Sequence, residues 1–264
     1  MATLLFCVLS LPGFGQEVDY TTLKDIQYYS ETENEYIKER CVLDLYYPTN
    51  LQKYPTIVWF HGGGLTGGNK ETPNALKAHG FAVITANYRL SPKIRAAECI
   101  KDAAAVVAWV FEHIEQYGGS KNKIIVSGHS AGGYLASMVG LDKSYLAEYD
   151  IDADMIAALV PFSGHAITHF TIRAENNIPG TQAVVDAYAP LYHVRKDAPP
   201  YIIITGDREM ELLGRYEENA YMARMMQLAG HKQTILHELE GYGHQMTAPA
   251  FPLLLKYSKT YTKD

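Results

Sequence analysis

Short apolar runs alternate with longer amphipathic segments along the chain. Runs rich in valine, isoleucine and aromatic residues predict buried strands, whereas apolar positions three or four residues apart predict helices with one face on a core. The clearest helical pattern covers residues 94–117 and ends at two glycines. The predicted strands are 26–29, 41–47, 56–60, 81–88, 123–126, 156–162, 201–205 and 234–239. The predicted helices are 72–79, 94–117, 134–139, 217–229 and 252–261.

From residue 56 onward, strands and helices alternate, which is typical of an α/β fold with a mostly parallel central sheet and helices on both faces. The charged segment 30–40 is expected to turn between the first two strands. Residues 165–190 have no clear period and contain several Gly, Pro and Asn, so we expect an excursion there, a small lid near the site. No repeat, low-complexity tract or linker interrupts the pattern, and residues 16–264 are predicted to form one domain.

The first fifteen residues are treated separately. Residues 4–11 are apolar but too short to span a bilayer, and Gly13 and Gly15 have the spacing that signal peptidase reads. No basic residue precedes the apolar run. We interpret residues 1–15 as a signal peptide, with a disordered or packed N-terminal arm as the alternative. The expected location is therefore periplasmic or secreted, and otherwise cytoplasmic.

Composition narrows the range of partners. The net charge is −6 and Lys and Arg form no cluster, so a nucleic acid is not expected as a partner. Beyond the leader the cysteines are Cys41 and Cys99, which could pair in an oxidising compartment, although the sequence does not bring them within bonding distance. Cys and His show no metal-ligand spacing, so no metal or cofactor is expected. Neither a membrane span nor an oligomeric state is indicated.

The strongest candidate for chemistry is Gly128-His129-Ser130-Ala131-Gly132, which lies between a predicted strand and a predicted helix. Small residues on both sides of a serine allow the sharp strand-to-helix turn called a nucleophile elbow, which exposes the hydroxyl. The start of the helix also offers free N–H groups and a positive dipole end to any negative charge formed there. We therefore predict Ser130 to be a nucleophile.

A second motif, His61-Gly62-Gly63-Gly64, follows the buried strand 56–60. Consecutive glycines lose much backbone entropy on folding and add no packing, but they can present N–H groups at close range. A phosphate-binding loop is the alternative, yet neither of its signatures is present. With a serine elbow downstream, the glycine run indicates an oxyanion hole.

A serine nucleophile needs a base and a carboxylate that orients it. His244 lies in a glycine-flanked loop after the last predicted strand, and the chain order serine, acid, histidine is that of α/β-hydrolases. His129, inside the elbow, is expected to line the pocket instead. The loop after strand 201–205 carries Asp207, Glu209 and Glu211, each a candidate acid or a surface charge.

Together these motifs resemble the α/β-hydrolase superfamily, in the esterase/lipase branch that includes hormone-sensitive-lipase-like enzymes and bacterial carbohydrate esterases of the acetyl-xylan and feruloyl types. The resemblance rests on the glycine run 61–64, the stretch 87–92, the elbow 128–133, Pro199-Pro200 and the His244 loop. It implies that the backbone N–H groups of Gly63, Gly64 and Ala131 bind the oxyanion.

The resemblance also bears on the acid. In the family the acid usually comes nine residues after the second proline of the Pro-Pro pair, which is Pro200 here and points to Glu209, where aspartate is more frequent. Counting backward from the predicted helix 217–229 points instead near Glu211. We prefer Glu209, with Glu211 and Asp207 as alternatives.

These observations predict a serine hydrolase that cleaves carboxylic esters through an acyl-enzyme, with Ser130, Glu209 and His244 as its catalytic residues. The chain has little room before residue 25 for the long N-terminal cap of lipase-like relatives, which implies an open site. Short-chain or carbohydrate-linked acyl esters, small or attached to a polysaccharide, are the expected substrates. An amidase, formamidase or peptidase with the same triad is the alternative. A non-catalytic binding protein would be expected to lack one of these residues.

Overall fold

The computed structural model of the chain describes residues 17–30, 32–212 and 214–263. The segment that we interpret as a signal peptide, residues 1–15, lies outside the described residues. Among the residues that are described, no helix is long and apolar enough to cross a membrane.

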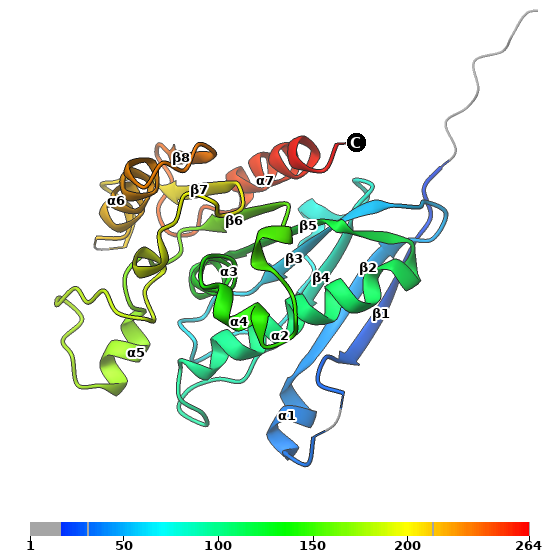
Figure 1. The fold of residues 1–264 in the computed structure, drawn as a ribbon, viewed down its shortest axis with the longest axis horizontal. Helices are drawn as coiled ribbons and strands as arrows, with labels where there is room; N and C mark the ends of the chain where they lie inside the picture. Colours follow the sequence, from blue (N-terminus) through cyan, green and yellow to red (C-terminus); the bar gives the residue numbers. More distant parts are fainter. Residues whose placement is uncertain (1–16, 31, 213, 264) are drawn as a thin grey trace, which may run out of the picture.

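An eight-stranded sheet forms the centre of the described structure, in the order β1-β2-β4-β3-β5-β6-β7-β8. The strands are β1 (Tyr20–Gln27), β2 (Val42–Pro48), β3 (Tyr54–Phe60), β4 (Ala82–Ala86), β5 (Gly119–His129), β6 (Ala158–Phe162), β7 (Tyr201–Gly206) and β8 (Thr234–Leu239). The two pairings of β2 are antiparallel and the others are parallel. Figure 1 shows β1, in blue, at one edge and β8, in orange, toward the other. The predicted α/β class with a mostly parallel sheet is confirmed.

Helices cover both faces of this sheet. They are α1 (Glu35–Arg40), α2 (Glu98–His113), α3 (Ala131–Leu141), α4 (Lys143–Ala147), α5 (Phe170–Glu175), α6 (Arg215–Leu228) and α7 (Thr247–Tyr261). Side chains alternate along a strand, so Val58 and Val126 belong to the core on the face covered by α2, α3 and α6, whereas Ile57 and Ile125 belong to the core on the face covered by α7. The continuous apolar runs in the central strands follow from this burial on both sides.

Two predicted elements differ from the structure. The charged segment 30–40 contains α1, because the side chain of Asn34 accepts the amides of Tyr36 and Ile37 at 3.0 and 3.3 Å and caps its start. The helix predicted at 72–79 is only a short 3₁₀ turn, Asn74–Leu76. There the backbone turns away, since Ala78 is left-handed at φ 61° and donates its amide to the Tyr46 hydroxyl at 3.2 Å.

Six parallel strands end at one edge of the sheet, and the candidate site residues follow five of them. Their carboxyl ends are Phe60, His129, Phe162, Gly206 and Leu239, on β3, β5, β6, β7 and β8. The loop after β6 is the longest and contains the expected excursion with α5. Side chains that follow these strands therefore meet at a single edge.

Candidate active site

The turn predicted around Ser130 is present between β5 and α3. Ser130 has φ 56° and ψ −116°, an uncommon backbone conformation, and donates its amide to the Phe162 carbonyl at 2.8 Å. A Cβ on Gly132 would lie 2.1 Å from the Phe60 carbonyl oxygen, so only glycine lets α3 approach the neighbouring strand this closely. The sharp turn holds the serine side chain at the edge where the loops gather.

His244 lies between Ser130 and a carboxylate. Its Nε2 is 2.9 Å from Ser130 Oγ, and its Nδ1 is 2.6 Å from Glu211 Oε1. An ionised carboxylate can only accept, so Nδ1 carries the proton and donates it. The lone pair of Nε2 therefore faces the serine hydroxyl, which donates to it.

The side chain of Glu211 is buried, and its carboxylate accepts four hydrogen bonds. Besides His244, its donors are the Leu212 amide at 2.9 Å, the Ser163 hydroxyl at 2.5 Å and the Gly206 amide at 3.2 Å. Burial raises the pKa of the Glu211 carboxyl, but the hydrogen bonds from His244, Ser163 and Leu212 outweigh it and lower the pKa to about 2. The carboxylate is therefore ionised at neutral pH.

The preference for Glu209 is corrected by this geometry. Glu209 is exposed, and among the described residues its carboxylate has no hydrogen bond or ion pair to His244. The chain turns at Asp207, whose carbonyl accepts the amides of Met210 and Glu211 at 3.0 and 2.9 Å. That turn brings residue 211, two positions further along, back toward the histidine. The Asp207 side chain caps the turn rather than contacting His244.

His129 lines the site, as expected, and also supports the histidine loop. Its Nε2 donates to the His244 carbonyl at 2.8 Å, and the two rings are 4.8 Å apart. Burial is the main cause that lowers the pKa of His129 to about 4, so the ring is neutral at neutral pH. The elbow thus contacts the backbone of His244 as well as its side chain.

The glycine run after β3 lies against the elbow. Gly63 has φ 111°, and a Cβ there would lie 2.2 Å from the Gly67 carbonyl oxygen, so the loop needs glycine at this position. The excursion covers the same loop. The ring of Phe170 lies 3.1 Å from where a Cβ on Gly64 would be, and the Thr171 hydroxyl donates to the Gly64 carbonyl at 2.5 Å.

A cleft of about 320 Å³ lies beside Ser130 and His244 and includes their chain neighbours His129 and Gln245. Its lining mixes polar and aromatic residues: Trp59, His61, Gly62, Asn69, Glu71, Pro73, His129, Gln245, Thr247 and Phe251. The part of the chain that the structure describes holds no group of three or more His, Cys, Asp or Glu side chains arranged to bind a metal ion. Cys41 and Cys99 are buried and free.

Sequence reasoning missed two residues behind the site, Ser163 and Arg215. Ser163 contacts both Glu211 and His244, and Arg215 donates to the Ser163 carbonyl. Ser163 looked only like the end of a strand. Its role depends on contacts across 48 and 81 residues of sequence, for which the local pattern carries no signal.

Comparison with known proteins places the chain in a family. The family model of BD-FAE matches residues 43–212. The chain belongs to the BD-FAE family. The BD-FAE match covers the glycine run, the elbow and Glu211, and it ends before His244.

Curated relatives of this BD-FAE protein are ester hydrolases by name. It is 28% identical over 208 residues to "Probable carboxylic ester hydrolase LipM" and 26% identical over 213 residues to "Esterase LipC", both of Mycobacterium tuberculosis. The matches cover 69% and 72% of the chain but 47% and 52% of the relatives. The chain thus spans about half the length of the curated relatives it matches.

Solved structures similar to the BD-FAE protein confirm the predicted α/β-hydrolase fold. A truncated carbohydrate esterase from gut microbiota superposes with a TM-score of 0.75 at 19% identity, covering 96% of this chain and all of that one (100%). Esterase B from Lactobacillus rhamnosis gives 0.70 at 18% identity, with 94% and 87% covered. With the family match, these likenesses confirm the resemblance to the esterase/lipase branch of the α/β-hydrolases.

Proposed function

We propose that the protein hydrolyses carboxylic esters, with Ser130 as nucleophile, His244 as general base and Glu211 as the carboxylate that orients it. The observation that carries this proposal is the unbroken series of hydrogen bonds from Glu211 through His244 to Ser130. The names of the relatives LipM and LipC, which describe ester hydrolysis, support the same chemistry.

In this reaction Ser130 Oγ attacks the ester carbonyl while His244 Nε2 takes its proton. The resulting imidazolium lies against the ionised Glu211, which stabilises the charge. His244 then gives the proton to the departing alcohol, leaving an acyl group on Ser130. Water, activated by His244 in the same way, hydrolyses the acyl-enzyme and restores the serine.

The oxyanion hole of the proposal consists of the backbone N–H groups of Gly63, Gly64 and Ala131. Ala131 is the first residue of α3, and the first amides of a helix have no acceptor within it. Gly63 and Gly64 belong to the loop that packs beside the elbow. Loss of one donor of this kind typically costs ~10²–10³ in rate.

For the substrate we propose a short acyl group on a polar alcohol such as a sugar. The cleft beside the serine carries Asn69, Glu71 and Gln245, whose side chains can hydrogen-bond to hydroxyl groups. The similar gut-microbiota structure is named a carbohydrate esterase, in keeping with this substrate class.

Labelling with an organophosphate tests the nucleophile. The intact protein should take up one phosphoryl group at Ser130, detected by mass spectrometry of its peptides, and Ser130→Ala should take up none. A second measurement compares p-nitrophenyl acetate, butyrate and longer esters with acetylated xylan, methyl ferulate and N-formylkynurenine. Absence of label on the intact protein would refute the serine mechanism, and preference for long acyl chains would refute the proposed substrate class.

A further inference from the structure

We propose that Ser163 is a positioning residue for Glu211, and that a buried cluster on the first turn of α6 keeps Ser163 in the conformation this role needs. The inference deepens the proposed function, because it concerns the carboxylate paired with His244. The Ser163 hydroxyl, held by this cluster, makes the carboxylate point in one direction.

Ser163 is placed between the two members of that pair. Its hydroxyl oxygen is 2.5 Å from Glu211 Oε2 and 3.1 Å from His244 Nδ1. A hydroxyl has one proton, and the short contact to an anionic oxygen requires that it donate there. Its lone pairs then face the Nδ1–H of His244, so one hydroxyl contacts both partners of the 2.6 Å hydrogen bond.

The backbone of Ser163 adopts a conformation that serine rarely has. Its φ is 46°, in the left-handed region, although it directly follows strand β6. Such a conformation persists only where the surroundings over-determine it. Here the amide of Ser163 donates to the Ile204 carbonyl at 2.7 Å, and the guanidinium of Arg215 donates to the Ser163 carbonyl.

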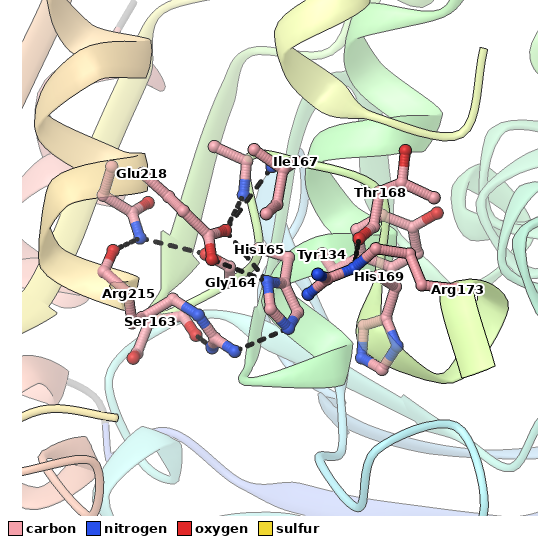
Figure 2. A network of polar contacts seen from close by, with 12 residues as sticks. Tyr134, Ser163, Gly164, His165, Ile167, Thr168, His169, Arg173, Arg215 and Glu218 are labelled. Atoms are coloured by element: carbon pink, nitrogen blue, oxygen red, sulfur yellow. Dashed lines mark hydrogen bonds and ion pairs between the residues drawn. The ribbon is translucent and has the colours of Figure 1, made fainter. Parts of the chain in front are cut away.

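Arg215 is held in turn by the buried ring of His165, whose other side contacts the Glu218 carboxylate. Figure 2 shows the ring of His165 between the Glu218 carboxylate and the Arg215 guanidinium. Because a guanidinium can only donate, His165 Nε2 accepts from Arg215 at 2.8 Å, and its Nδ1–H donates to Glu218 at 2.9 Å. Arg215 and His165 are only 2% and 6% exposed, so water hardly competes for these hydrogen bonds.

The same network ties the residue after Ser163 to α6. The Asn219 side chain donates to the Gly164 carbonyl at 3.0 Å and to the Arg215 carbonyl at 2.8 Å. Two consecutive carbonyls of the loop after β6 are therefore bound by side chains from one helix. This double attachment fixes the direction of the Ser163 side chain toward Glu211. Figure 2 shows Ser163 and Gly164 beside Arg215.

Four charged or titratable side chains lie around the His244–Glu211 pair and bear on the pH dependence of activity. They are His129 from β5, His165 from the excursion, and Arg215 and Glu218 from α6. Burial holds the pKa of His165 well below its usual range and lowers that of His129 to about 4. Burial raises the pKa of the Glu218 carboxyl, so the acidic limb of the kcat/KM profile is compared between the wild type and the Ser163 variants, which share all four groups.

The test compares Ser163→Ala and Ser163→Gly with Ser137→Ala as a matched control. Ser137 is another buried hydroxyl, bonded to the Gly133 carbonyl and to Tyr201, away from the catalytic hydrogen bonds. Both Ser163 variants should lose about tenfold to a hundredfold in kcat on p-nitrophenyl acetate, the range for a hydrogen bond to a charged group, with little change in KM. Ser137→Ala should keep wild-type kcat.

The glycine variant separates positioning from backbone strain. Glycine adopts φ 46° freely whereas alanine does not, so Ser163→Gly should unfold at a higher temperature than Ser163→Ala while both lose turnover. The acidic limb of the kcat/KM profile should also move to higher pH in this variant. Without the serine donor, the Glu211 carboxylate attracts the His244 imidazolium more strongly. Wild-type kcat and an unmoved limb in Ser163→Gly would overturn the proposal.

A readout without substrate keeps this test independent of the esterase proposal. The Nδ1 proton of His244, in its 2.6 Å hydrogen bond to Glu211, should give a downfield ¹H NMR signal. That signal should shift or broaden in both Ser163 variants and stay in place in Ser137→Ala. An unchanged signal in Ser163→Gly would overturn the positioning role, whereas absence of esterase activity in the wild type would overturn only the proposed function.

Discussion

Replacing Glu211 by glutamine puts an amide where four donors converge. His244 Nδ1 and the Leu212 amide donate to Oε1, whereas the Ser163 hydroxyl and the Gly206 amide donate to Oε2. The new NH₂ group must face one of these two pairs. Toward His244 it would force the proton onto Nε2 and leave Ser130 without an acceptor. Toward Ser163 the hydroxyl can rotate and accept, so this second orientation is the less costly one.

The size of the effect follows from that orientation. His244 keeps an acceptor, but its imidazolium loses an ionised partner at 2.6 Å. A hydrogen bond to a charged group contributes about 1.5–3 kcal/mol, and the short distance favours the upper end of that range. At about 1.4 kcal/mol for each factor of ten, kcat should fall about a hundredfold. A loss of ~10⁴ would instead indicate the wrong tautomer of His244.

Stability should change with the same substitution, in a pH-dependent way. The pKa of Glu211 in the folded protein is about 2, below its ordinary value of 4.5, so its contribution to stability is present above pH 4.5 and is lost as pH falls toward 2. The Gln variant lacks this contribution and leaves the Gly206 amide without its acceptor, at about 1–3 kcal/mol. Urea unfolding at several pH values should show the two proteins converging as pH approaches 2.

The assay measures kcat on p-nitrophenyl acetate for Glu211→Gln beside Glu209→Gln, with folding checked by circular dichroism. Glu209 is exposed, and its replacement should leave kcat within about twofold of the wild type, as for a surface position without such contacts. Equal activity of Glu211→Gln and the wild type, or an equal loss in both variants, would refute the assignment of Glu211.

Two further substitutions, the first with a control variant, test the structure around the site. Gly132→Ala should abolish soluble, active protein, since its Cβ would lie 2.1 Å from the Phe60 carbonyl oxygen, whereas Gly180→Ala, with open space around it, should behave like the wild type in expression and thermal unfolding. Asp102→Ala should lower the free energy of unfolding by about 3–5 kcal/mol, because it leaves the charge of Arg89 in a largely buried pocket without its partner at 2.6 Å. Its kcat should be unchanged in the folded fraction, and a large loss of turnover there would contradict this separation of stability from activity.

The sheet and the elbow could be predicted from the sequence because their causes are local. The central strands are short runs of buried apolar residues, and Gly128 and Gly132 mark the sharp turn around Ser130 directly. The order of strands and helices along the chain then leaves few arrangements of the sheet. A histidine in the loop after the last strand follows from the same order.

The acid could not be predicted because its position depends on contacts between distant loops. Whether residue 209 or 211 reaches His244 is set by a turn at Asp207, whose carboxylate accepts the Gly241 amide at 2.7 Å. Asp207, Glu209 and Glu211 stand at alternate positions, and the local sequence does not distinguish between them. The start of α1 was visible in principle, since Asn34 is a favoured capping residue, but a helix of six residues adds little hydrophobic pattern.

The excursion between β6 and β7 is attached to the glycine loop after β3 at its start and exposed in its middle. Phe170 and Thr171 contact Gly64, whereas residues 176–188 are mostly exposed. Arg173 organises that exposed part by donating to the carbonyls of Gly180 and Gln182, which every amino acid provides. Apart from Asp186, which accepts from the Thr168 hydroxyl and the Tyr188 amide, most side chains between residues 176 and 188 are therefore free to diverge in evolution, or to be randomised in a directed-evolution library, while the geometry around Ser130 and His244 stays the same.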